Sequence, residues 1–111
     1  MSFYFVTTTV ASREQALGLE SIILEGRLAA CVQRIDIESA YWWKGRIERE
    51  PEILLLVKTC GDMVESLISV IQENHTYETP EIVAFPIASG LPDYLKWIDS
   101  ICRRGGEDDE R

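Results

Sequence analysis

The chain has 111 residues and a formal net charge of −8 at pH 7, and hydrophobic residues make up 46% of it. This length and composition predict one folded domain with its own core rather than a disordered chain. The acidic balance argues against binding to nucleic acid, which needs clustered lysine and arginine. No apolar run reaches the roughly 18 residues of a transmembrane helix, so no membrane partner is expected.

The first half of the chain predicts a strand, a helix and a long strand, in that order. Residues 3–9 are mainly aromatic or β-branched, which is typical of a strand. Ser12 begins a capping box, apolar residues follow at helical spacing, and Gly26 is placed as the left-handed residue that ends the helix. Small and apolar residues at 28–32 then open a strand that alternates between apolar and polar residues as far as Trp43.

The second half repeats this order. The charged run 46–52 is interpreted as a turn or as the extension of a hairpin, and the uniformly apolar residues 53–57 as a buried central strand. An apolar stripe at helical spacing over 64–71 predicts a second helix. Residues 82–85 predict a fourth strand, and Pro92 suits the first position of a last helix.

Two strand–helix–strand units followed by a helix predict an α+β fold of the ferredoxin-like, split βαβ type. Its antiparallel sheet would carry two helices on one face, which leaves the other face to be covered by oligomerisation. A single domain is expected over residues 1–103. Residues 104–111 are predicted to form a disordered acidic tail.

Three cysteines, Cys31, Cys60 and Cys102, are an odd number and show no Cys-x-x-Cys spacing. Residues 1–6 lack the basic region and the cleavage site of a signal peptide. A disulfide framework is therefore not expected, and a cytoplasmic location is predicted.

Polar chemistry is concentrated between the second helix and the last strand, from Asn74 to Ile82. This stretch holds the only histidine, His75, and two carboxylates, Glu78 and Glu81. Polar residues in a connection of this kind mark a candidate site. No catalytic residue is expected, because two glutamates three apart in an extended segment point to opposite faces and no nucleophile–base motif is present.

Five motifs carry a resemblance to a known family: Arg27-Leu28-Ala29-Ala30-Cys31-Val32, Ser39-x-Tyr41-x-Trp43-x-Gly45-x-Ile47-Glu48, Leu54-Leu55-Leu56-Val57-Lys58-Thr59, His75-x-Tyr77-Glu78-x-Pro80-Glu81-Ile82 and Tyr94-Leu95-x-Trp97-Ile98. By their order and spacing over residues 3–101, the chain resembles the CutA family of divalent-cation tolerance proteins. The resemblance implies a ferredoxin-like homotrimer, similar in assembly to PII signalling proteins, and a link to tolerance of copper and other divalent metals.

The chain departs from the family pattern at three places near the candidate site. Thr76 stands where relatives usually have proline, and Asn74 where some have a second histidine. Thr8 and its neighbours stand in the first strand where some relatives have a cysteine. If those side chains bind metal in the relatives, this chain lacks them.

His75 and Cys31 are the candidate metal ligands, for Cu(II) or another divalent cation. A tight site needs about three or four protein ligands, so Glu78 and Glu81 are considered as companions. The alternatives are that His75 is a polar residue near a helix end and that Cys31 packs as a small hydrophobic side chain.

A cleft between subunits is predicted to be lined by Trp43, Lys58, Tyr77, Glu78 and Glu81. Lys58 would hold an anionic ligand there, or else form a structural ion pair. Aromatic residues such as Tyr41, Trp43, Tyr77 and Trp97 would line the cleft or anchor the interface.

The sequence therefore predicts a non-enzymatic homotrimer that binds copper or another divalent cation weakly and requires no cofactor. The alternatives are a PII-like sensor that binds a small metabolite or anion between subunits, and a trimeric scaffold without a ligand.

Overall fold

The computed structural model describes residues 1–102, and the tail predicted at 104–111 lies outside them. The elements follow in the order β1 (Phe3–Val10), α1 (Arg13–Glu25), β2 (Cys31–Trp43), β3 (Arg46–Cys60), the 3₁₀ turn η1 (Gly61–Met63), α2 (Val64–Glu73), β4 (Ile82–Pro86) and α3 (Pro92–Cys102). Within residues 1–102, no helix is long and apolar enough to cross a membrane.

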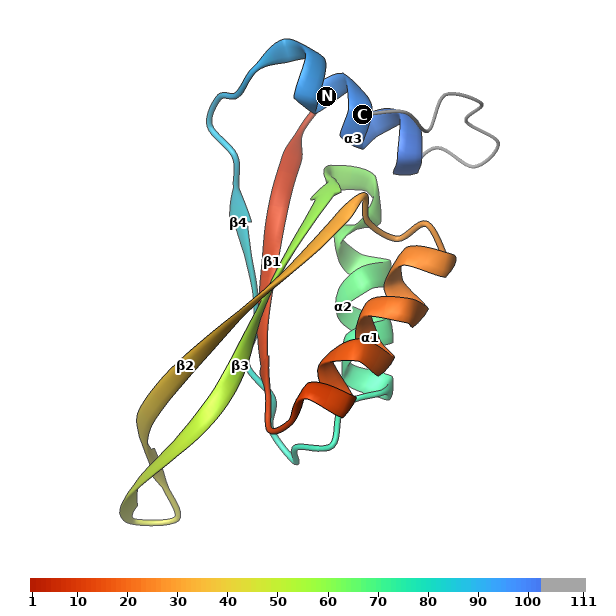
Figure 1. Ribbon diagram of the computed structural model, residues 1–111. Helices are drawn as coiled ribbons and strands as arrows, with labels where there is room; N and C mark the ends of the chain where they lie inside the picture. Colours follow the sequence, from red (N-terminus) through yellow and green to blue (C-terminus); the bar gives the residue numbers. More distant parts are fainter. Residues whose placement is uncertain (103–111) are drawn as a thin grey trace.

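The four strands form one antiparallel sheet in the order β2-β3-β1-β4. The two βαβ units interlock in this sheet: β3 lies between β1 and β2, and β1 lies between β3 and β4. This is the ferredoxin-like arrangement. Figure 1 shows α1 and α2 together on one face of this sheet. The predicted α+β fold with an additional C-terminal helix is confirmed.

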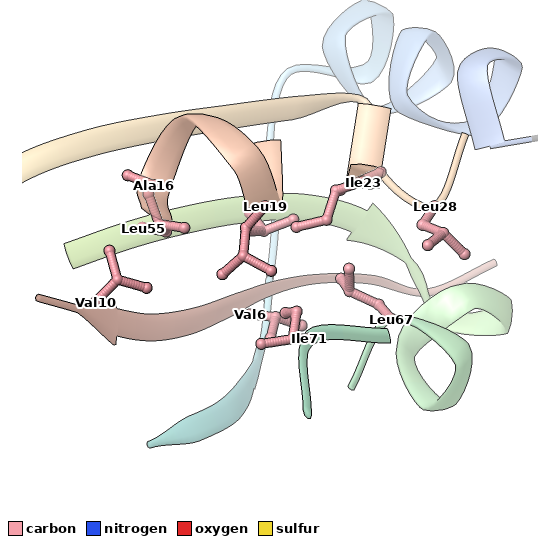
Figure 2. Close-up of a cluster of buried hydrophobic side chains, with 11 residues drawn as sticks. Val6, Val10, Ala16, Leu19, Ile23, Leu28, Leu55, Leu67 and Ile71 are labelled. Atoms are coloured by element: carbon pink, nitrogen blue, oxygen red, sulfur yellow. The ribbon is translucent and has the colours of Figure 1, made fainter. Parts of the chain in front are cut away.

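The core lies between the sheet and the pair α1 and α2. Alternate residues of β1 and β3, such as Val6 and Leu55, point toward the helices and are fully buried. The helices contribute residues at helical spacing: Ala16, Leu19 and Ile23 from α1, and Leu67 and Ile71 from α2 (Figure 2). Burial of each leucine or isoleucine stabilises the fold by about 1.5–3 kcal/mol, so this cluster holds the layers together.

A smaller cluster joins α3 to the end of the sheet at which β1 begins and β3 ends (Figure 1). Its buried members are Phe3, Cys60, Ile98 and Cys102. Trp97 and Tyr94 pack against this cluster, with their ring centroids 5.6 Å apart. Trp97 is therefore part of the α3 packing in the single chain.

The face of the sheet opposite α1 and α2 stays open in the described chain. Ile35, Val83 and Phe85 are 45%, 43% and 42% exposed on it. Phe5 and Phe85 face each other in the β1–β4 register and stack with their centroids 5.0 Å apart. Val83 and Phe85 thus form an exposed apolar patch on β4 beside Phe5, and Ile35 lies on the opposite edge strand, β2. Apolar patches of this kind often mark sites of protein–protein contact.

β2 and β3 extend beyond the rest of the sheet as a two-stranded arm, residues 37–52 (Figure 1). β1 ends opposite Ile53, so the arm residues of β3 pair only with β2. Pro51 is tolerated there because that side of β3 is an open edge. Lys44 and Gly45, with φ of 51° and 79°, form the two-residue turn that closes the arm.

The structure decides one interpretation that the sequence left open, and it differs from the prediction in one detail. Residues 46–52 continue the strand at 53–57 without a break, so the hairpin extension is the correct interpretation of the charged run. The helix α1 ends as predicted, but Gly26 has a φ of −81° and Arg27 is the left-handed residue, with a φ of 53°. The Leu28 N–H donates to the Ile23 carbonyl at 3.0 Å, which closes this end as a Schellman motif around Arg27.

Candidate functional site

The polar stretch 74–81 leaves α2, passes the end of β1 and enters β4 (Figure 1). His75 is held there by both ring nitrogens. Its Nε2 lies 2.8 Å from the Thr9 carbonyl oxygen, and its Nδ1 accepts the Tyr77 backbone N–H at 3.1 Å. Because a carbonyl oxygen only accepts and an N–H only donates, Nε2 carries the proton and Nδ1 carries none. The imidazole is thus neutral, and both of its possible metal-binding atoms are engaged.

Tyr77 connects this stretch to the arm. Its hydroxyl donates to Oε2 of Glu52 at 2.7 Å, and Glu52 is only 7% exposed. Burial, and then the hydrogen bond to Glu52, raises the pKa of the Tyr77 phenol above its usual value. The phenol therefore stays a donor at neutral pH and satisfies a carboxylate that would be costly to bury alone.

A second phenol–carboxylate pair lies further along the arm. The Tyr41 hydroxyl donates to Glu50. This hydrogen bond, followed by desolvation and by the neighbouring carboxylates, raises the pKa of Tyr41 to about 12. Because Glu48, Glu50 and Glu52 alternate along β3, they share one face of the arm with Tyr41.

Two adjoining hollows lie between the arm and residues 76–81, and we refer to them together as the arm cleft. The larger has a volume of about 500 Å³, and its lining includes Tyr41, Glu52, Tyr77 and Glu81. The smaller has a volume of about 280 Å³ and is lined by Tyr41, Trp43, Thr76, Tyr77, Glu78 and Thr79. The cleft thus combines carboxylates with aromatic walls.

Four of the five residues predicted to line a cleft meet there. Trp43, Tyr77 and Glu78 line the smaller hollow, and Tyr77 with Glu81 lines the larger one. Lys58 lies near the other end of β3, where its Nζ donates to Oε1 of Gln33 at 2.5 Å. In a single chain, Lys58 therefore contributes no positive charge to the arm cleft.

The two predicted metal ligands lie at different places in the chain. His75 contacts Thr9 near the end of β1, whereas Cys31 begins β2 opposite Lys58. Among residues 1–102, no three His, Cys, Asp or Glu side chains are grouped closely enough to hold a metal ion. The assignment of His75 and Cys31 to one metal site stays a prediction, and a shared ion would need ligands from a second chain.

Glu52 is the residue of this site that the sequence analysis missed. The run 46–52 was interpreted from its charged composition, and the spacing of its glutamates was not considered. Glu48, Glu50 and Glu52 recur at every second position, which is the spacing of one strand face. That period was the signal for a strand with aligned carboxylates, although it does not show that Glu52 is buried.

The chain matches the family model described as CutA1 divalent ion tolerance protein over residues 4–101. It is 37% identical over 99 residues to the chloroplastic protein CutA 1 of rice (Oryza sativa subsp. japonica), covering 88% of this chain and 56% of that protein. The chain spans about half the length of the plant relatives that it matches.

Solved structures agree with this match. The periplasmic divalent cation tolerance protein CutA of Archaeoglobus fulgidus superposes with a TM-score of 0.89 at 37% identity, covering 91% of this chain and 99% of that chain. CutA1 of Oryza sativa gives a TM-score of 0.89 at 35% identity, covering 95% of this chain and 97% of that chain. The chain therefore belongs to the CutA1 divalent ion tolerance protein family.

Proposed function

We propose that the protein acts in tolerance to divalent cations, as a homotrimer that binds copper or another divalent ion weakly and catalyses no reaction. The observation that carries this proposal is the placement of two carboxylates, Glu52 and Glu81, on one hollow of about 500 Å³ in a chain of this family. Carboxylate oxygens bind divalent cations, and an acidic surface raises the local concentration of cations. Two carboxylates are fewer than a full set of ligands, which accounts for weak binding.

His75 is the nearby nitrogen ligand, and its hydrogen bonds limit what it contributes. To bind copper, the imidazole must release the Thr9 carbonyl or the Tyr77 N–H. Each such hydrogen bond stabilises the fold by about 0.5–1.5 kcal/mol, so His75 binds metal at a cost to the local structure. Cys31 would join the site only from a neighbouring chain.

Calorimetric titration with Cu(II) tests the carboxylates directly. We expect the replacement Glu81→Gln to weaken copper binding by about tenfold or more, since even outer partners of metal ligands are worth about 10–100-fold. The replacement Glu65→Gln, on the exposed surface of α2, is the matched control and should leave the affinity unchanged. Equal affinity in the Glu81→Gln variant and the unaltered protein would remove this cleft as the cation site.

The homotrimer is supported by the open face of the sheet. Val83 and Phe85 on β4, and Ile35 on β2, are exposed apolar residues of this face, and their burial between chains would be favourable. We expect the replacement Phe85→Asp to dissociate the assembly in sedimentation experiments, with the circular dichroism of the fold retained. Leu91 is 70% exposed outside the sheet, so Leu91→Asp should leave the trimer intact. A monomeric unaltered protein, or a trimeric Phe85→Asp variant, would contradict the proposal.

A PII-like sensor is the second candidate, and the smaller hollow favours it. Trp43, Tyr41 and Tyr77 give this hollow flat walls on which a small ring compound could stack. A screen of nucleotides and anions by thermal unfolding, repeated on Trp43→Ala, tests this candidate. Ligand-induced stabilisation that disappears in Trp43→Ala supports a sensor. If neither copper nor any metabolite binds, a trimeric scaffold is left.

A cytoplasmic location is part of the proposal, and it is supported by the unpaired state of Cys31, Cys60 and Cys102. Relatives differ on this point, since their names include chloroplastic and periplasmic proteins. Fractionation of cells that produce the protein would test it.

A further inference from the structure

Two cysteines that have no partner motif in the sequence meet in the structure. Cys60 is the last residue of β3 and Cys102 is the last residue of α3. They are 8% and 1% exposed and belong to the same buried cluster, with Phe3 and Ile98 around them. This cluster lies at the α3 end of the molecule, away from the arm cleft (Figure 1).

The groups around the two sulfurs are mostly apolar, and the carboxylate of Asp62, in the turn after β3, also acts on Cys60. Cys102 Sγ lies 3.6 Å from Oγ1 of Thr59, and that hydroxyl donates to the Leu28 carbonyl at 2.7 Å. Because the single hydroxyl hydrogen is used toward Leu28, the Cys102 thiol is the donor toward Thr59. Burial, followed by the neighbouring Cys102, raises the pKa of the Cys60 thiol to about 11. The Cys60 side chain is therefore a thiol when nothing is bound.

A third sulfur accompanies them. Met63 lies in the turn directly after β3 and packs against the cluster that contains Cys60 and Cys102. Cys31 is outside this cluster, on β2. The same cluster thus holds two thiols and has a thioether side chain packed against it. Thiolates and thioethers are the soft ligands that select soft metal ions.

The surroundings exclude the ions that need more or harder ligands. Zinc in a structural site takes four nitrogen or sulfur ligands, and calcium takes six or more oxygens. Across residues 1–102, no group of three His, Cys, Asp or Glu side chains could supply them. This cluster could therefore hold only a metal ion for which two or three sulfur ligands are sufficient.

We propose that Cys60 and Cys102 form a binding site for one soft monovalent metal ion, copper(I) or silver(I), with the Met63 thioether as a third sulfur. On binding, two S–H bonds break, two sulfur–metal bonds form, and two protons leave to solvent without any transfer of electrons. Because the ligands must lose protons, the affinity increases with pH. The site uses different residues and a different class of ion from the divalent site proposed above.

Disulfide formation is the competing chemistry for two adjacent thiols. The thiolate is the attacking species in thiol–disulfide exchange, Cys60 and Cys102 are both buried, and burial raises the pKa of the Cys60 thiol. Exchange at this site is therefore slow, and the dithiol form persists for metal binding.

The test uses the full chain, reduced without added thiols and kept free of oxygen. Copper(I) is titrated against a coloured copper(I) chelator, and the release of protons is recorded in parallel. We expect one tightly held ion per chain, two protons released per ion, and the ultraviolet absorption of a copper–thiolate bond. Loss of an outer partner of a metal ligand costs about 10–100-fold in affinity, so Cys60→Ala and Cys102→Ala should each weaken binding by at least about 100-fold.

Cys31→Ala is the matched control, because it removes a thiol outside the cluster, and it should keep the full affinity. Alanine is chosen because a buried cysteine behaves as a small hydrophobic residue, and the melting temperature of each metal-free variant verifies folding. Met63→Leu should weaken binding by a smaller factor, and unchanged affinity would remove the third sulfur from the proposal.

Three results would overturn the dithiol site. One is copper(I) affinity that survives in Cys60→Ala or in Cys102→Ala. Another is loss of binding in Cys31→Ala alone. The third is a mass two hydrogens too low in the reduced protein before metal is added, which would show that Cys60 and Cys102 are joined as a disulfide instead.

Discussion

The Tyr77 hydroxyl donates to the buried Glu52 carboxylate at 2.7 Å, although the two residues are 25 positions apart in the chain. Glu52 belongs to the arm and Tyr77 to the connection between α2 and β4. This one bond therefore ties the base of the arm to the stretch that carries His75, and both of its residues line the larger hollow of the arm cleft.

Tyr77→Phe should destabilise the protein by about 1–3 kcal/mol, because it leaves the Oε2 atom of a buried carboxylate without its donor. The measurement is urea unfolding at a fixed protein concentration, since an oligomer's apparent stability depends on concentration. Tyr41→Phe is the control, because the Tyr41–Glu50 pair is exposed and should leave the unfolding midpoint unchanged. An equal decrease in the free energy of unfolding of the two variants would contradict the prediction that only the Tyr77–Glu52 hydrogen bond stabilises the fold.

The two phenols also predict how stability changes in alkali. The pKa of Tyr41 is raised to about 12 in the folded protein, and that of Tyr77 is raised as well, from an unfolded value near 10. A raised pKa stabilises the folded state fully below the unfolded pKa, and this contribution disappears as the pH rises through the folded pKa. Stability should thus decline from about pH 10 upward.

Phenolate absorbance measured during an alkaline titration tests this. The chain has four tyrosines. Two of them, Tyr41 and Tyr77, should ionise later than an ordinary tyrosine while the circular dichroism stays native. A single transition of all four near pH 10 in a folded protein would contradict the prediction, and Tyr77→Phe should remove the latest part of the curve.

Much of the fold was predictable because its signals are local. The Ser12 hydroxyl accepts the Gln15 N–H at 3.2 Å, as the capping box predicts, and the helical stripe that includes Leu67 and Ile71 is buried. The end of α1 was predictable to within one residue: Gly26 was expected at the left-handed position, and Arg27 occupies it. A glycine adopts that conformation most easily, so the local signal favoured Gly26.

The candidate site was predictable only in part, because its main contacts join distant segments. The motif at 75–81 marked His75, Tyr77 and Glu81, and they do lie at the end of β1 and beside the arm. Burial of Glu52 depends on Tyr77, and the meeting of Cys60 with Cys102 depends on where α3 packs. Neither contact produces a regular spacing of residues in the sequence, so neither could be predicted from it.

Thr8 offers a test of packing within the core. It is fully buried on β1, and its hydroxyl has no hydrogen-bond partner in the part of the chain that the structure describes. Thr8→Val keeps the shape and removes an unsatisfied polar group, so it should stabilise the protein by about 1–3 kcal/mol. Thr59 is equally buried, but its hydroxyl donates to Leu28, so Thr59→Val should destabilise by about 1 kcal/mol.

Urea unfolding of both threonine variants gives the comparison. A loss of stability in Thr8→Val, similar to that in Thr59→Val, would mean that the Thr8 hydroxyl has a partner such as a buried water.

Two glycines with open space around them should respond in opposite directions to alanine. Gly18 lies within α1, and a methyl group there meets nothing within 4 Å. Gly18→Ala should therefore stabilise the protein by about 1 kcal/mol, because alanine favours the helix and glycine does not. The added methyl group would also narrow the hollow of about 160 Å³ that Gly18 shares with His75.

Gly45 has equally open surroundings but a φ of 79°, in the turn of the arm. Gly45→Ala should destabilise by about 1–2 kcal/mol, since a side chain is strained in that conformation. Thermal and urea unfolding of the two variants separate backbone conformation from available space, because space is the same at both positions. If both alanines stabilised the protein, the left-handed turn at the tip of the arm would be wrong, and the pairing of Trp43 with Arg46 that depends on it would have to shift.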